Sequence, residues 1–240
     1  MKKMLSRFFI DKSYDEMVKS YNKSDAHYIA IIFCIYIITI SLNLFIRRIY
    51  NLSFLALIPS MMIQVITVFA VIIKKKNLLA SIGITKKNFI QSFFTGIFFS
   101  IVIVFALDSF NRIRELIQQG SILEILLSIT FWFVFVSFSE EVVFRGYIQP
   151  RIYGYVKNDI IAVLIGGFLF ALMHLPTVII DHVLGISLFI FSISFIEWFF
   201  MFFLFHFILN SLYRKYNSIV APFILHGFMN LSLINTTIFL

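Results

Sequence analysis

Two adjacent glutamates, Glu140 and Glu141, interrupt a stretch of the chain that is otherwise apolar. Residues 121–138 before them carry Glu124 as their only charge, so the pair falls where a membrane-crossing helix is still in hydrocarbon. An ionised carboxylate at that depth costs roughly 2.5–3.5 kcal/mol unless it faces protein or water. Carboxylates are rarely retained at such a cost unless they have a use.

The spacing of the charged residues predicts different roles for the two glutamates. On a helix with about 3.6 residues per turn, Glu141 and Arg145 share a face, whereas Glu140 and Glu141 diverge by about 100°. We therefore expect the guanidinium of Arg145 to hold one carboxylate and leave Glu140 free for chemistry. The alternative is a purely structural ion pair that joins two helices.

Three further polar side chains recur in the apolar blocks of the second half. His174 precedes a helix-ending proline, and His226 and Asn230 are four residues apart, so they share a helix face. His174 could instead be an interfacial histidine, and the second pair could form a packing hydrogen bond between helices. His206 and Asn210 repeat the same spacing, so this pattern alone is weak.

Together these residues contain a base, an orienting group and oxyanion donors. A glutamate would take a proton from water while His174 positions that water. His226 and Asn230 would then stabilise the oxyanion of a tetrahedral intermediate. The chemistry predicted is peptide-bond hydrolysis without a covalent enzyme intermediate.

The composition indicates the elements that must position these groups. Of the 240 residues 60% are hydrophobic and 13% are charged, and the apolar residues form blocks close to the length that crosses a bilayer. We expect an all-α, polytopic transmembrane helix bundle of about seven spans. The spans predicted are 26–46, 52–73, 89–107, 121–149, 159–175, 185–212 and 218–238.

The basic residues lie in short clusters between the apolar blocks, which predicts no nucleic-acid partner. Most of the 20 Lys and Arg residues fall in segments on one side, so the positive-inside rule places the N-terminus inside. Residues 1–25 are expected to form a cytoplasmic amphipathic segment on the lipid surface. Residues 26–119 would hold the first spans and an interfacial helix at 108–119, and residues 120–240 the catalytic spans.

Three motifs in order, Glu140-Glu141-x-x-x-Arg145, Phe170-x-x-x-His174 and His226-x-x-x-Asn230, resemble the CPBP (Abi) family of intramembrane proteases. That family includes the type II CAAX prenyl endopeptidases and bacteriocin-processing or self-immunity proteins. The resemblance covers about residues 120–235. It implies Glu140 as general base with His174, His226 and Asn230 as oxyanion stabilisers, and Glu141 with Arg145 as a supporting pair.

The resemblance leaves the question of a metal open. Glu140, His174 and His226 could supply three ligands of an open zinc site, but the chain has no His-Glu-x-x-His motif. We expect no metal to be required. One departure from the family lies at His206 and Asn210, where members usually carry small residues, and it bears on the shape of the substrate cavity.

The leading hypothesis is an intramembrane endopeptidase that cleaves a membrane-associated peptide or protein, in the plasma membrane of a bacterium. As the family implies, a peptide pheromone, a bacteriocin precursor or a membrane-protein tail would be its substrate. The alternative is a non-catalytic bacteriocin-immunity or scaffold protein that binds a peptide or membrane partner through the same cavity. Glu140→Ala separates the two, because only a peptidase should lose its phenotype.

Overall fold

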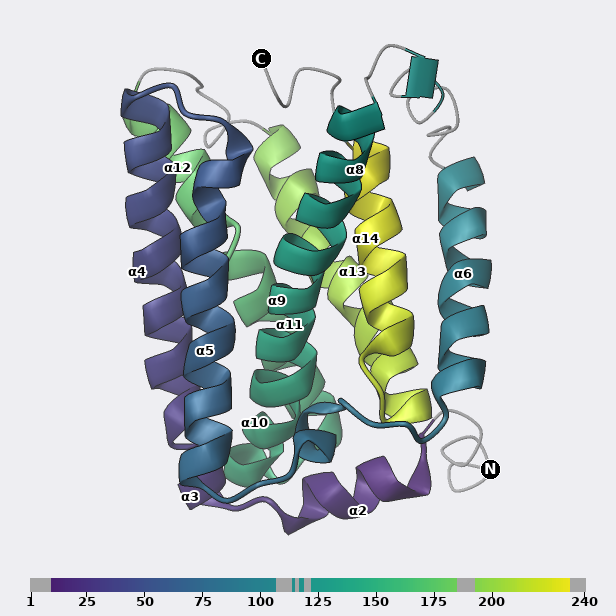
Figure 1. The fold of residues 1–240 in the computed structure, drawn as a ribbon. Coiled ribbons are helices and arrows are strands. Elements are labelled where there is room, and N and C mark those ends of the chain that lie inside the picture. Colours follow the sequence, from purple (N-terminus) through teal and green to yellow (C-terminus); the bar gives the residue numbers. More distant parts are fainter. Residues whose placement is uncertain (1–9, 107–113, 115–116, 119–121, 185–192, 234–240) are drawn as a thin grey trace.

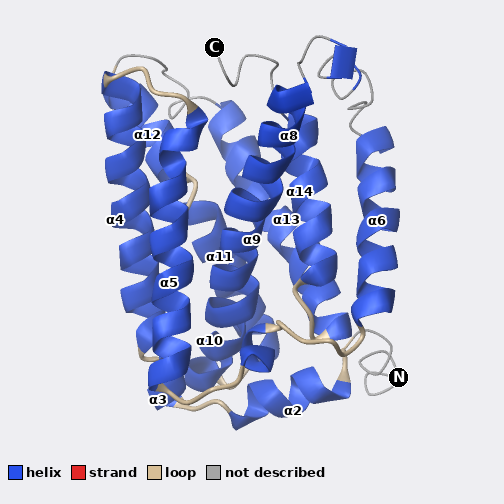
Figure 2. Ribbon diagram, viewed as in Figure 1, coloured by secondary structure: helices blue, strands red, loops and turns tan. Residues whose placement is uncertain are grey.

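The computed structural model describes residues 10–106, 114, 117–118, 122–184 and 193–233. The secondary structure in these ranges is helical, with no strand (Figure 1, Figure 2). The longer helices are α2 (Lys12–Ser20), α4 (Tyr28–Ile49), α5 (Ile58–Lys74), α6 (Phe89–Ala106), α8 (Ile122–Thr130), α10 (Gln149–Val156), α11 (Asp159–Leu172), α12 (Leu175–Val183), α13 (Ile193–Tyr216) and α14 (Val220–Leu233). Short helical segments are α3 (Lys23–Ala26), η1 (Phe54–Leu57), η2 (Leu79–Ile82), η3 (Phe131–Ser137), α9 (Phe138–Glu140) and η4 (Glu141–Ile148). The predicted all-α class is confirmed.

Six helical stretches are long and apolar enough to cross a membrane. They are Lys23–Ile49, Phe54–Lys74, Phe89–Ala106, Ile122–Val156, Asp159–Val183 and Phe195–Tyr216. These stretches correspond to the first six expected spans, and they confirm a polytopic bundle. In the seventh expected span, 218–238, the described apolar stretch Val220–Leu231 is shorter than the others. The interfacial helix expected at 108–119 lies largely outside the described residues, and the inside position of the N-terminus stays a prediction.

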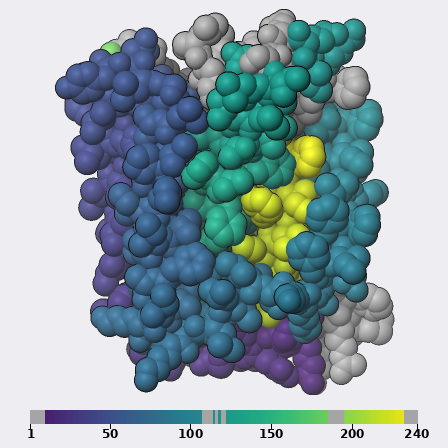
Figure 3. All heavy atoms as spheres, in the orientation of Figure 1, coloured from purple at the N-terminus to yellow at the C-terminus, as the bar shows by residue number. Residues whose placement is uncertain are grey.

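Small residues bring α14 against α6. Ser92, Gly96 and Ser100 recur every four residues on α6 and are buried. The Ala221 N–H donates to Ser92 Oγ across 2.9 Å, and a Cβ added at Gly96 would lie 3.0 Å from the Ala221 carbonyl oxygen. Such close approach is typical of helix pairs in lipid. Figure 3 shows α14, in yellow, between α6 and the helix formed by α8 and η3. Helix α14 therefore packs against a neighbour on both sides.

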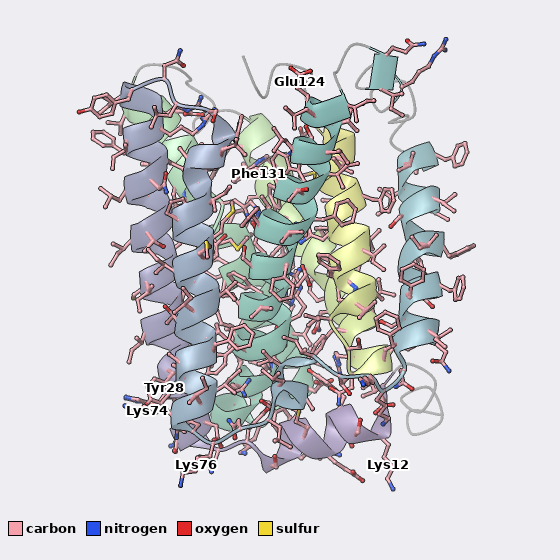
Figure 4. All side chains as sticks on the ribbon, viewed as in Figure 1. Lys12, Tyr28, Lys74, Lys76, Glu124 and Phe131 are labelled. Atoms are coloured by element: carbon pink, nitrogen blue, oxygen red, sulfur yellow. The ribbon has the colours of Figure 1, made fainter. Side chains whose placement is uncertain are left out.

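The outward faces of the helices are apolar. On α6, the side chains of Ile90, Phe94 and Phe105 are 66%, 66% and 72% exposed. Apolar surface of this extent is stable against lipid and not against water. Lys12, Lys74 and Lys76 project from one end of the bundle and Glu124 lies at the other (Figure 4). The chain is therefore a multi-pass membrane protein with a charged end on each side of an apolar middle.

Helix α2 lies across the basic end of the bundle (Figure 1). It is amphipathic, because Tyr14 and Val18 are buried while Lys12 and Lys19 are exposed. Its buried side chains pack on the bundle. The lipid contact expected of the N-terminal segment stays a prediction, and residues 1–9 lie outside the described part.

Asp11 fixes the start of α2. Its side chain accepts hydrogen bonds from the Ser13 N–H at 2.8 Å, from Lys87 Nζ at 3.0 Å and from Asn88 Nδ2 at 3.1 Å. Its own N–H donates to the Arg214 carbonyl oxygen at 2.9 Å. One carboxylate thus caps α2 and also ties it to the loop before α6, while its backbone ties it to the end of α13.

Protonation of Asp11 at low pH should weaken these contacts. Burial raises the pKa of Asp11, but the hydrogen bonds from Ser13, Lys87 and Asn88 prevail and lower it to about 2. Because the folded-state pKa lies below the unfolded one, the stabilisation is complete above about pH 4 and is lost as the pH falls toward 2. We expect Asp11→Asn to lower the unfolding midpoint at pH 6, and the difference from wild type to shrink between pH 4 and pH 2. A difference that does not depend on pH would contradict this role.

Candidate active site

The two glutamates lie in the middle of one long helical stretch, Ile122–Val156. Glu140 ends α9 and Glu141 begins η4. The turns on both sides, η3 and η4, are π-helical, a wide winding that is frequent at functional sites. Glu141 is fully buried and Glu140 is 8% exposed. The wide turns set both carboxylates inside the bundle without ending the helix.

Two side chains on different helices, Arg145 and His226, bind the Glu141 carboxylate. Arg145 Nη1 lies 3.0 Å from Glu141 Oε1, and both side chains are completely buried. His226 Nδ1, on α14, lies 2.7 Å from the same oxygen. The Arg145 guanidinium also stacks over the Phe170 ring, 4.0 Å from its centroid. Glu141 therefore joins the central helix to α14.

His226 bridges the two carboxylates. Its Nδ1 faces Glu141, and its Nε2 lies 3.5 Å from Glu140 Oε2. An ionised Glu141 can only accept, so Nδ1 carries a proton. Nε2 then faces Glu140 Oε2, an oxygen that makes no hydrogen bond to any described residue.

His174 lies at the junction of α11 and α12. Its Nδ1 lies 2.9 Å from the Phe170 carbonyl oxygen. Because a carbonyl only accepts, Nδ1 carries the proton, and the neutral ring keeps Nε2 as an acceptor. The ring stacks on Phe202 at a centroid distance of 3.6 Å. Both contacts fix the orientation of the ring.

Asn230 lies one turn beyond His226 on α14. Its Nδ2 donates to Ser137 Oγ at 3.2 Å, and that hydroxyl donates to the Trp132 carbonyl oxygen at 2.7 Å. The carboxamide is thus oriented by the π-helical turn η3. A Cβ added at Gly227 would lie 2.4 Å from the Phe133 ring, so glycine permits this close packing of α14 on η3.

A cavity of about 520 Å³ connects these groups. Glu140, His174, His226 and Asn230 all line it. Its wall is mainly apolar and includes Ile40, Leu44, Leu57, Met61, Phe131 and Met173. It extends from Glu140 to the partly exposed Arg47 and Arg48 at the end of α4. The cavity is large enough for several peptide side chains and has polar groups at both ends.

Comparison with known proteins identifies the part of the chain that holds most of this site. Residues 122–232 match the sequence model of the family "Type II CAAX prenyl endopeptidase Rce1-like". This segment is referred to as the Rce1-like domain, after the family that it matches. No curated protein and no solved structure matches the chain. The match supports the predicted resemblance to the CPBP and CAAX protease group, which is a family of proteases.

The Rce1-like domain runs from α8 to α14 and contains every residue that the sequence predicted for the site. The structure brings Glu140, His174, His226 and Asn230 to one cavity. It places Glu141 and Arg145 behind them as a buried ion pair.

His206 and Asn210, the departure from the family, do not line this cavity. Both are buried, and His206 Nε2 lies 3.1 Å from Gln149 Oε1. A Cβ added at Gly166 would lie 1.6 Å from that oxygen, so α11 leaves room there for the amide of Gln149. The His206 side chain is thus accommodated between α10, α11 and α13, away from this cavity.

Sequence reasoning missed a tyrosine from outside the Rce1-like domain. Tyr36, on α4, is buried, and its hydroxyl donates to Glu140 Oε1 across 3.5 Å. Its ring packs edge-on against Phe144, with centroids 5.7 Å apart. Tyrosine is common in membrane spans, so only its central position in the first apolar block could have pointed to it.

If Glu140 acts in catalysis, loss of the Tyr36 hydroxyl should weaken its action modestly. The hydrogen bond is at the long limit, so its contribution is expected to be about 1 kcal/mol. Tyr36→Phe should lower kcat/KM for a cleaved peptide by roughly 3- to 10-fold. Tyr50→Phe, in a side chain that is 70% exposed just after α4, is the matched control. Equal rates for the two variants would show that the Tyr36 contact has no role in the reaction.

The three candidate zinc ligands, Glu140, His174 and His226, lie on separate helical stretches. Among the described residues, no three His, Cys, Asp or Glu side chains are grouped so that they could hold one metal ion. His226 directs Nδ1 to Glu141 and His174 directs Nδ1 to a backbone carbonyl, so both keep Nε2 open, as a metal-bound histidine would. The side chains of Glu140, His174 and His226 are nevertheless not grouped closely enough in this structure to hold one zinc ion together.

Proposed function

We propose that this chain is an intramembrane endopeptidase that hydrolyses a peptide bond of a membrane-associated peptide or protein. The observation that carries the proposal is that Glu140, His174, His226 and Asn230, from three separate helical stretches, line one cavity in a protein of a protease family. Charged and polar groups placed this deep in an apolar bundle are typical of functional sites.

Glu140 is the general base. In the state where His226 carries both ring protons, Glu140 is ionised and takes a proton from water. The Nε2 acceptor of His174 holds the second hydrogen of the same water and so orients its oxygen toward the substrate carbonyl. The new C–O bond forms, the peptide C–N bond breaks, and Glu140 passes the proton to the leaving amine.

His226 and Asn230 stabilise the oxyanion. His226 Nε2–H and the Asn230 carboxamide are donors on one face of α14, one turn apart, and both line the cavity. Glu141 and Arg145 do not line it. They hold His226 in place through the 2.7 Å contact of Nδ1 with Glu141 and balance the buried charges.

The apolar wall of the cavity favours an apolar peptide segment, such as a membrane-associated peptide, a bacteriocin precursor or the tail of a membrane protein. We propose a location in the plasma membrane of a bacterium, with residues 120–240 as the catalytic spans. If the basic end faces the cytoplasm, as the charge bias predicts, the Arg47 end of the cavity faces the opposite side.

The test is cleavage of a peptide library by the purified full-length chain in detergent, read by mass spectrometry with and without a chelator. New carboxyl termini in wild type but not in Glu140→Gln support the peptidase. Loss of cleavage with chelator would show that the metal-free scheme is wrong. A folded chain that binds peptides but cleaves none would support the non-catalytic immunity or scaffold role instead.

A further inference from the structure

The buried face of α13 is polar, although this helix is one of the membrane-crossing stretches. His206, Asn210 and Tyr213 follow one another at spacings of four and three residues, so they share one face of the helix. Their side chains are 0%, 1% and 0% exposed. Leu204 and Ile208 on the outward side are apolar and are 59% and 43% exposed. A row of buried polar side chains in an apolar helix is costly unless each one has a hydrogen-bond partner.

Each of the three side chains has a polar atom that makes no hydrogen bond to any described residue. These atoms are His206 Nδ1, Asn210 Oδ1 and the Tyr213 hydroxyl oxygen. The other nitrogen of His206, Nε2, lies 3.1 Å from Gln149 Oε1 and carries the proton, because a carboxamide oxygen only accepts. In the neutral ring Nδ1 is then an acceptor, and Asn210 Oδ1 is an acceptor as well. Both atoms therefore need a molecule that donates hydrogen bonds.

These requirements favour water as the ligand. An anion only accepts hydrogen bonds, and a buried cation would need a carboxylate, which none of the three side chains contacts among the described residues. Water is neutral and donates twice, so one molecule can donate to both His206 Nδ1 and Asn210 Oδ1, which belong to neighbouring side chains on successive turns. A second molecule can join Asn210 to the Tyr213 hydroxyl. We propose that water binds in a file along this face of α13.

One end of the file lies at the basic end of the bundle. Asn217 directly follows α13 and is 8% exposed. Its Oδ1 is another buried acceptor without a hydrogen bond to any described residue. Its Nδ2 donates to Ser13 Oγ of α2 across 3.0 Å. Water therefore enters the file beneath α2, next to Tyr213.

The other end lies behind the catalytic cavity. The Phe170 ring centroid is 5.8 Å from that of His206 and 4.0 Å from the guanidinium carbon of Arg145. Arg145 Nε and Nη2 and Glu141 Oε2 are also buried without a hydrogen bond to any described residue. Water at this end can accept from Arg145 and donate to Glu141. The file thus ends at the ion pair that holds His226.

The file provides a second route for water, on the side away from the mouth of the cavity. The cavity extends toward Arg47 at the end of α4, whereas α2 lies across the opposite end of the bundle (Figure 1). A peptide bound in the cavity would close this mouth, although hydrolysis consumes water. The file supplies water to the polar core from the basic end while the peptide is bound. This role rests on the proposed function, whereas the water sites themselves do not.

The experiment is solid-state NMR of the full chain in lipid bilayers, with its five histidines labelled with ¹⁵N. Magnetisation is transferred from water protons to the ring nitrogens, and the His206 signals are those that His206→Phe or His206→Gln removes. We expect transfer to the buried His206 at a rate within about 3-fold of that for the exposed His27. Asn210→Leu should slow this transfer roughly 10-fold, and the lipid-facing control Ile208→Leu should not change it.

Two results would overturn the water file. The first is slow transfer to His206 in the wild type, or a rate that Asn210→Leu leaves unchanged. The second comes from denaturant titration. A hydrated Asn210 loses hydrogen bonds in Asn210→Leu, so the variant should unfold at a lower denaturant concentration than the wild type. If Oδ1 were dry, removing an unpaired buried acceptor would instead make the variant more stable.

A final measurement tests the route and uses the Glu140→Gln chain saturated with an apolar peptide from the library. Transfer from water to His206 should persist in this complex. Its loss on peptide binding would show that water enters through the mouth of the cavity and would overturn the route from the basic end. A chain that neither binds nor cleaves peptides would reject the proposed function, while transfer to His206 in the free chain would still uphold the water sites.

Discussion

Replacing Glu140 by glutamine is expected to lower kcat for peptide cleavage by roughly 10²- to 10⁴-fold, the range typical of a lost general base. The amide keeps the size of the side chain and its position in the cavity, but it cannot take a proton from water. Substrate binding should change little, so the loss should appear in kcat and not in KM. The measurement is steady-state cleavage of a peptide from the library by purified protein.

The matched control is Glu124→Gln, because Glu124 belongs to the same helical stretch as Glu140 but lies at the opposite end of the bundle from α2 (Figure 4). It should cleave at the wild-type rate. If Glu140→Gln retained wild-type kcat while remaining folded, Glu140 would not be the base, and the assignment of roles around it would be wrong.

Replacing Arg145 by methionine is expected to produce the largest loss of stability, about 3–5 kcal/mol. The change leaves the Glu141 carboxylate in a fully buried position, with Arg145 no longer compensating its charge. It also removes the guanidinium that stacks on Phe170. The free energy of unfolding should be measured by denaturant titration in mixed micelles.

The double variant Glu141→Gln with Arg145→Met tests the cause of that loss. Since both charges are removed together, it should be more stable than Arg145→Met alone. Lys76→Met, at an exposed position, controls for the change of side-chain type and should have little effect. If the double variant were less stable than Arg145→Met, the ion pair would not be the source of the effect.

The charged and polar part of the site could be predicted because such residues are conspicuous in apolar sequence. The spacing of Glu141 and Arg145 predicted an ion pair, and the structure has that contact at 3.0 Å. His226 and Asn230 were expected on one face, and both line the cavity with Glu140. A charged or polar side chain in hydrocarbon has a high free-energy cost, so its presence in an apolar stretch indicates a specific role.

Other features of the site could not be predicted from the sequence. Tyr36 is compatible with lipid, so its contact with Glu140 depends on how α4 packs on the central helix. The π-helical turns η3 and η4 have no pattern distinct from an α-helix, although they set the positions of the carboxylates. The dual contact of His226 with Glu140 and Glu141 is a tertiary feature that no local spacing specifies.

In the proposed mechanism, water activated by Glu140 attacks the peptide bond directly. The most direct measurement is a single turnover in H₂¹⁸O with the protein in excess, stopped by denaturation and analysed by mass spectrometry of both peptide and protein. We predict one ¹⁸O atom in each new carboxyl terminus and no peptide bound covalently to the protein. A covalent peptide adduct on any side chain, or cleavage by Glu140→Gln at the wild-type rate, would contradict the account.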